Sequence, residues 1–155
     1  MPKLDLSKVP VKTGSIYRTL CLDGEGTLVA AAWRCRGLTQ FGVNLVSLDP
    51  GAMSSLRHWH MAEDEFVMVT EGECVMVQDA GETVMRPGDC AAFPAGSTDG
   101  HHFINRTDKV AKFLVIGSKA KREVATYSDV DLKVEIEGGK ARFTYKDGTD
   151  WVGPK

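Results

Sequence analysis

The 155-residue sequence predicts an all-β protein, either a sandwich or a barrel of short strands. Three observations carry this prediction. Short runs rich in β-branched and aromatic residues recur at even intervals from Thr39 onward, residues typical of turns separate them, and no helical period of useful length interrupts them. Strands spaced in this way bury alternate side chains in a shared core, which a chain with 43% hydrophobic residues can fill.

The elements follow in chain order. Residues 1–14 contain Pro2 and Pro10 and show no helical stripe, so we expect an arm rather than a packed element. Residues 14–22 predict a first strand, whereas residues 28–35 fit a helix or a strand equally well. The runs that predict the remaining strands of the barrel are 40–48, 55–60, 65–70, 74–78, 83–86, 89–93, 101–105 and 111–117.

The C-terminal part continues this pattern after a charged interruption. Residues 119–123 predict a solvated connection. Residues 131–137 and 141–145 flank Gly138-Gly139-Lys140 and predict a hairpin. Because an isolated hairpin is marginal in water, it must pack on the barrel or on a second subunit. Trp151 is the expected anchor of the tail.

Composition excludes several classes of partner. The net charge of -2 and the pI near 6.1 argue against nucleic acid, whose binding rests on concentrated Lys and Arg. No span approaches 18 apolar residues and no secretory signal is seen, so we expect no membrane association and a cytoplasmic location. The four cysteines, Cys21, Cys35, Cys74 and Cys90, are scattered singly, and we interpret them as small buried hydrophobic residues.

The four histidines occur as two pairs, His58/His60 and His101/His102. On a strand, His58 and His60 point to the same face, so two imidazole nitrogens can converge on one cation, and Glu65 can reach the same point from the next strand. The alternative for His58 and His60 alone is a pair of half-exposed imidazoles without a ligand role.

Two spaced motifs surround these residues. The first consists of Gly51, His58, His60, Glu65 and Gly72, and the second of Gly88, Pro94, Gly96, His101 and Asn105. Over about residues 39–117 this pattern resembles both motifs of the cupin superfamily. It departs from them by one extra residue before His58 and by a loop of four residues, 97–100, where the second motif has two.

The resemblance implies a jelly-roll (double-stranded β-helix) barrel in a single domain spanning residues 1–155, with an N-terminal arm and a C-terminal hairpin extension over residues 123–155. It also implies a homodimer, as small cupins commonly form. The metal ligands that we predict are His58, His60, Glu65 and His101. His101 is preferred to His102 because His101 shares a strand face with Phe103 and Asn105, but the longer loop leaves His102 as an alternative.

Three imidazoles and a carboxylate suit one divalent transition metal, Fe, Mn, Ni, Co, Cu or Zn, without selecting among them. Cupins of this type imply a small metal-dependent enzyme acting on a hydroxylated or carboxylated metabolite, similar to sugar phosphate isomerases. A non-catalytic module that binds a sugar or an organic acid is one alternative, and a metal-dependent dioxygenase is another. A regulator's sensor domain is disfavoured because no helix-turn-helix pattern precedes the barrel.

Arginines near the motifs could bind an anionic ligand, although arginine at a strand edge is usually solvated. The candidates are Arg57, Arg86 and Arg106. Asn105-Arg106-Thr107 matches a glycosylation sequon, but the match of Asn105 to the second motif is the better interpretation.

Overall fold

The computed structural model describes residues 11–13, 27–31 and 38–152, and every regular element in these ranges is a strand. The strands are β1 (Val11–Thr13), β2 (Thr27–Ala31), β3 (Phe41–Leu48), β4 (His58–His60), β5 (Glu65–Glu71), β6 (Cys74–Gln78), β7 (Gly81–Met85), β8 (Cys90–Phe93), β9 (His102–Ile104), β10 (Ala111–Ser118), β11 (Arg122–Tyr127), β12 (Lys133–Glu137) and β13 (Lys140–Thr144). No helix long and apolar enough to span a membrane occurs among these residues.

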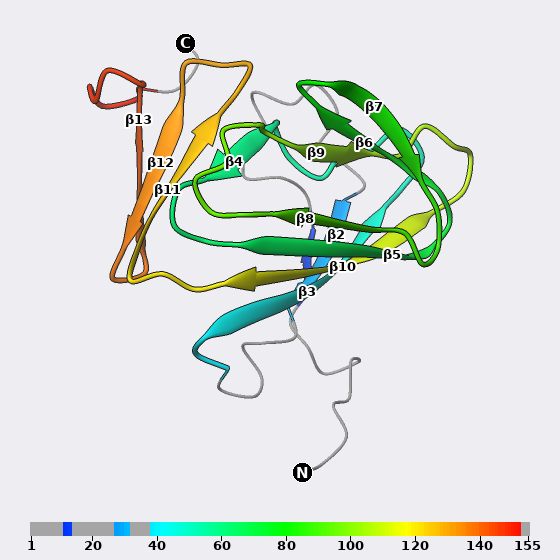
Figure 1. The fold of residues 1–155 in the computed structure, drawn as a ribbon. Coiled ribbons are helices and arrows are strands. Elements are labelled where there is room, and N and C mark those ends of the chain that lie inside the picture. The colour runs from blue at the N-terminus through cyan, green and yellow to red at the C-terminus, as the bar shows by residue number, and fades with distance from the viewer. Residues whose placement is uncertain (1–10, 14–26, 32–37, 153–155) are drawn as a thin grey trace.

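The strands form three antiparallel sheets (Figure 1). The largest has the order β1-β2-β3-β10-β5-β8, a second has the order β13-β12-β11-β4, and a third has the order β7-β6-β9. An isolated bridge between His58 and His101 joins the second sheet to the third. The all-β jelly-roll fold that the sequence predicts is therefore confirmed.

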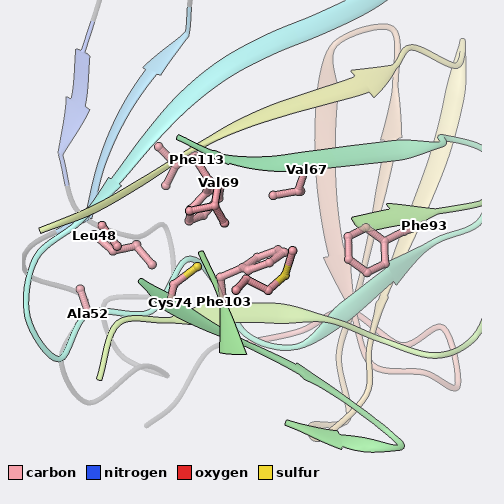
Figure 2. Close-up of a cluster of buried hydrophobic side chains, with 11 residues drawn as sticks. Leu48, Ala52, Val67, Val69, Cys74, Phe93, Phe103 and Phe113 are labelled. Carbon is pink, nitrogen blue, oxygen red and sulfur yellow. The ribbon is translucent and has the colours of Figure 1, made fainter. Parts of the chain in front are cut away.

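The main core lies between the six-stranded and the three-stranded sheets (Figure 2). Alternate apolar side chains of both sheets point inward, and full burial of a phenylalanine or valine contributes about 1.5–3 kcal/mol each. The buried side chains are Val46, Leu48, Ala52, Val67, Val69, Cys74, Met85, Phe93, Phe103, Ala111 and Phe113.

A second apolar cluster holds the C-terminal hairpin in place. Ala125 and Tyr127 of β11 pack with Leu132 and Val134, and the ring of Trp151 lies 6.0 Å from that of Phe143 on β13. The predicted hairpin and the anchoring role of Trp151 are thus confirmed, and the hairpin obtains the packing partner that it needs.

Two elements differ from the sequence prediction. Residues 119–123 are not simply a solvated connection, because Arg122 begins β11 and Glu123 is buried. Part of the expected N-terminal arm, Val11–Thr13, is strand β1, which pairs with β2 through backbone groups and so needs no apolar pattern of its own.

The other predicted strands can be compared with the structure only where the residues are described. The predicted strands between residues 40 and 117 all overlap observed ones, with ends that shift by a few residues. The ambiguous segment 28–35 is a strand as far as Ala31. The predicted strand 14–22, residues 32–37, Cys21 and Cys35 lie outside the described residues.

The interpretation of the cysteines holds for one described residue and is wrong for the other. Cys74 is buried, and this burial, together with the charge of Glu73, raises the pKa of its thiol to about 11. Cys90 is exposed, because it begins β8 at the edge of the six-stranded sheet.

Candidate metal centre

His58 and His60 project from the short strand β4, which forms the edge of the C-terminal sheet. The backbone of β4 pairs with β11, where His58 lies opposite Tyr127 and His60 opposite Ala125. The period of two along the strand puts both imidazoles on one face, and their ring centroids lie 4.9 Å apart.

His101 is brought beside His58 by the backbone. The amide of His58 donates to the carbonyl of His101 at 3.2 Å, and the amide of His101 donates to the carbonyl of His58 at 2.9 Å. Directly opposed residues of an antiparallel pair point their side chains to the same face, and here the two ring centroids are 5.5 Å apart. The ring of Phe93 stacks on that of His101, with 3.4 Å between the ring centroids and 8° between the ring planes. This stacking fixes the plane of the imidazole.

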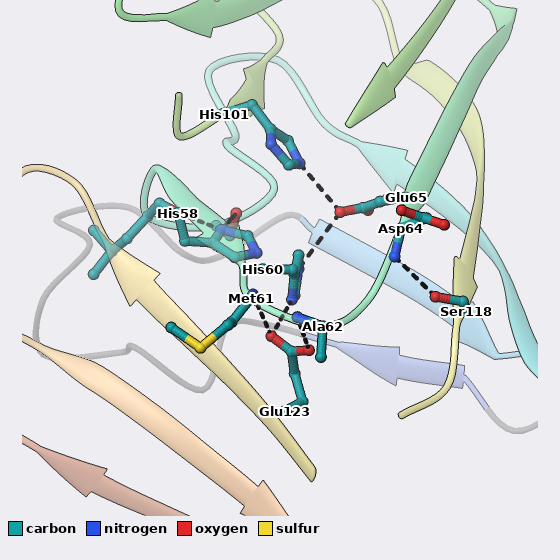
Figure 3. A network of polar contacts seen from close by, with 11 residues as sticks. His58, His60, Met61, Ala62, Asp64, Glu65, His101, Ser118 and Glu123 are labelled. Atoms are coloured by element: carbon teal, nitrogen blue, oxygen red, sulfur yellow. Dashed lines mark hydrogen bonds and ion pairs between the residues drawn. The ribbon is translucent and has the colours of Figure 1, made fainter. Parts of the chain in front are cut away.

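Glu65 reaches the same point from the opposite, six-stranded sheet (Figure 3). Its Oε2 lies 3.1 Å from Nε2 of His101 and 3.6 Å from Nε2 of His60. His58, His60 and Glu65 each offer one ligand atom, and these three atoms all lie within 4.8 Å of one another. These three residues could hold a metal ion together, and His101, the fourth predicted ligand, contacts Glu65 from beside them.

The surroundings favour the protonation states that metal ligands need. Burial, with the neighbouring His60 and His101, lowers the pKa of His58 to about 4, so its imidazole is neutral at pH 7 and can offer a lone pair. Burial alone would raise the pKa of Glu65, but the hydrogen bond from His101 and the nearby histidine charges outweigh it and the pKa is lowered. Glu65 is therefore an ionised donor.

His102 takes the other face of β9. It is half-buried, whereas the side chains of its neighbours His101 and Phe103 are both buried. Burial lowers the pKa of His102, and the charges that act on it most come from Asp129 and Arg57. This placement away from Glu65 favours His101 as the ligand.

Two cavities adjoin the cluster and share its residues. The inner one, of about 180 Å³, is lined by His58, Glu65 and His101 together with apolar core side chains. The outer one, of about 550 Å³, is lined by His58, His60 and Glu65 among other residues. Its remaining wall includes Glu63, Lys119, Lys121, Ile136 and Gly139. A small molecule in the outer cavity would contact the histidines and the C-terminal extension at once.

Glu123 is a residue of this region that the sequence interpretation missed. It is 2% exposed, and its carboxylate accepts hydrogen bonds from the amides of Met61 at 2.8 Å and Ala62 at 2.9 Å. Its Oε1 also lies 3.5 Å from Nδ1 of His60. The available signal was the alternation of Glu123, Ala125 and Tyr127, all buried on one face of β11.

The three candidate arginines all pair with carboxylates. Arg57 binds Asp79 and Asp129, the latter at 2.7 Å. Arg86 contacts Glu73, and Arg106 contacts Glu82. None of the three arginines lines either cavity described above. They form ion pairs between segments of the chain instead of contributing to the candidate metal centre.

Asn105 supports the turn that follows β9. Its buried side chain donates to the carbonyls of Leu48 at 2.9 Å and Lys109 at 2.7 Å, and accepts from the amide of Thr107 at 3.0 Å. Such saturation of a buried amide explains its place in the second motif without a role at the metal.

A jelly roll in which His58, His60 and Glu65 can hold a metal, with His101 in contact with Glu65, defines a cupin-type protein with a candidate metal centre. The cupin domain family matches residues 44–117. The chain is 52% identical to a sugar phosphate isomerase of the cupin superfamily from Silicibacter pomeroyi, over 98% of each chain and with a TM-score of 0.92. This chain belongs to the cupin superfamily.

More distant structures share the fold alone. A polyketide cyclase from Streptomyces resistomycificus is 21% identical, with 76% of this chain and 79% of that chain covered and a TM-score of 0.59. No curated protein matches the chain in a sequence search. Cupins commonly bind a divalent metal, and the described residues offer a His/Glu group that can hold one.

Proposed function

We propose that this protein is a metal-dependent sugar phosphate isomerase. The observation that supports it most is the 52% identity, over 98% of both chains, to the sugar phosphate isomerase from Silicibacter pomeroyi. The convergence of histidines and Glu65 beside an open cavity of about 550 Å³ agrees with this assignment, because a small phosphorylated sugar fits a cavity of this size.

In this proposal one divalent transition metal is held by His58, His60, Glu65 and His101. The mixed nitrogen and oxygen donors suit Fe, Mn, Ni, Co, Cu or Zn. When bound, the metal supplies Lewis-acid chemistry, which polarises a carbonyl or hydroxyl oxygen of the substrate. The protein contributes the fixed donors, because Phe93 and the paired backbone of His58 and His101 hold the rings in place.

The phosphate end of the substrate is assigned to the lysine side of the outer cavity. Lys119 and Lys121 both line this cavity, as do His58 and His60, and an ammonium group is a common partner of phosphate. The C-terminal extension closes the same wall through Ile136 and Gly139 of the hairpin. The substrate would therefore lie between the metal ligands and the extension.

An isomerase that interconverts an aldose and a ketose must move a proton between neighbouring carbons, and a carboxylate at the cavity surface can carry it. Glu63 lines the outer cavity beside Glu65. Burial raises the pKa of Glu63, whereas the pKa of Glu65 is lowered by its histidine neighbours. We assign the proton transfer to Glu63, because the carboxyl group with the higher pKa is the stronger base. Glu65 stays ionised as a metal ligand.

The test is direct observation of isomerisation. Protein loaded with each candidate metal is mixed with a panel of aldose and ketose phosphates, and NMR follows their interconversion. We expect turnover of at least one pair. The Lys119→Ala/Lys121→Ala double variant should raise KM at least tenfold for the phosphorylated sugar and leave the metal content unchanged.

Two results would contradict the isomerase. Metal-loaded protein that binds sugars without converting any of the panel would support a binding module instead. Oxygen uptake with small acids would support a dioxygenase.

The homodimer, the cytoplasmic location and the single domain stay predictions of the sequence.

A further inference from the structure

Glu123 has a buried carboxylate, and burial of a charged group is costly unless polar or charged side chains contact it. It is 2% exposed on β11, a strand outside the part of the chain that the cupin domain family matches. Its two oxygens accept hydrogen bonds from the amides of Met61 and Ala62, the two residues that follow His60. These amides orient the carboxylate but bring no full positive charge to offset its burial.

Among the described residues, His60 is a side-chain neighbour of this carboxylate that can carry a proton donor toward it. Nε2 of His60 faces Glu65 Oε2 at 3.6 Å, on the side of the candidate metal centre. Nδ1 lies on the other side, 3.5 Å from Glu123 Oε1, and it is buried without a hydrogen bond to any described residue. A proton on Nδ1 would lie on the side of this carboxylate and would leave the lone pair of Nε2 on the side of the centre.

We propose that Glu123 is a positioning residue that holds His60 in the tautomer with its proton on Nδ1, so that Nε2 is kept as a metal donor. A carboxylate that accepts the second N–H of a ligand histidine fixes the ring and strengthens the bond to the metal. The inference rests on the proposed function only in requiring a metal on His60, and it is independent of the reaction.

A second cation site is the competing explanation, because ligand atoms of His60, Glu63 and Glu123 also lie within 4.8 Å of one another. Both oxygens of Glu123 already accept from backbone amides, and Glu63 Oε1 accepts from the amide of Ala120 at 2.8 Å. Oxygens committed to amides in this way favour the positioning role over a metal ligand.

The test uses Co²⁺, whose visible spectrum reports its ligands. In Glu123→Gln, either orientation of the new amide sets its NH₂ group against an N–H donor, from Met61 and His60 or from Ala62. We expect the dissociation constant for Co²⁺ to rise about 10- to 100-fold, with the spectrum changed and one ion bound per chain. In the His60→Ala background the same substitution should change the dissociation constant less than twofold.

An equal loss of affinity in both backgrounds, or no loss in either, would overturn the positioning role while the metal centre stands. Binding of a second Co²⁺ that Glu123→Gln abolishes would also overturn it. Wild-type protein that binds no Co²⁺ and none of the other candidate metals would instead overturn the proposed function.

A second measurement needs no substitution that could disturb folding. In Zn²⁺-loaded wild-type protein with ¹⁵N-labelled histidine, NMR should show His60 protonated at Nδ1 and bound to zinc through Nε2. Zinc bound at Nδ1, or a proton on Nε2, would overturn the inference.

Discussion

Glu63 and Glu65 lie two residues apart and experience different electrostatic surroundings. Glu63 is half-buried, and desolvation is the main cause of its raised pKa. Glu65 is affected by burial in the same direction, but the histidines beside it lower its pKa overall. Two carboxyl groups separated in this way can divide their roles, one moving a proton and the other staying ionised.

Replacement of Glu63 by glutamine tests this division. Because the base must be deprotonated, kcat/KM of the wild type should fall as pH drops through the raised pKa of Glu63, above the usual 4.5 of a glutamate. Glu63→Gln should lower kcat by about 100-fold and remove this acid limb, with KM and metal content little changed. A variant with full activity and an unchanged pH profile would contradict the assignment.

Single residues of the site were predictable to different degrees. His58, His60 and Glu65 follow from local spacing, because strand alternation sets their direction. Glu123 was missed because Lys119 and Lys121 make its segment look solvated and hide its alternation with Ala125 and Tyr127. Its burial depends on the amides of Met61 and Ala62, which lie some sixty residues earlier in the chain.

The turns between strands bring the elements of the site together. Gly72 connects β5 to β6 with φ at +72°, and a Cβ added there would lie 2.5 Å from the carbonyl oxygen of Val110. Gly51 has a similar φ of +80° but open space around it. The first motif thus contains one glycine needed for conformation alone and one needed also for close packing.

Alanine substitutions separate these two requirements. Gly51→Ala should lower the free energy of unfolding by about 1 kcal/mol through backbone strain. Gly72→Ala adds a clash with backbone atoms and should cost about 3 kcal/mol or more. Denaturant unfolding of the two metal-free variants measures the difference. An equal loss in the free energy of unfolding would show that the contact with Val110 does not contribute to stability.

At the level of elements, periodicity predicted the strands of the barrel and the hairpin β12–β13 well. It failed for β1, whose place is set by backbone pairing with β2, and for the start of β11, where charged residues hide the alternation. The pairing of His58 with His101 could not be derived from either segment alone, because it depends on how two sheets meet.

Over the whole molecule, the candidate centre lies where all three sheets contribute. The six-stranded sheet supplies Glu65, β4 of the C-terminal sheet supplies two histidines, and His101 precedes β9 of the third. The C-terminal extension adds Glu123 behind His60, and the hairpin lines the outer cavity. The extension is therefore part of the site as well as of the fold.

Metal analysis of two neighbouring histidine variants tests this arrangement most directly. His101 and His102 are adjacent in sequence, but only His101 lies within 3.1 Å of Glu65. Each variant, His101→Ala and His102→Ala, is purified without added metal, checked for folding by circular dichroism, and measured by mass spectrometry of its metals. We predict that the wild type and His102→Ala retain about one transition metal per chain and that folded His101→Ala loses most of it. Retention of the metal by His101→Ala, or its loss from His102→Ala alone, would contradict the four-residue centre.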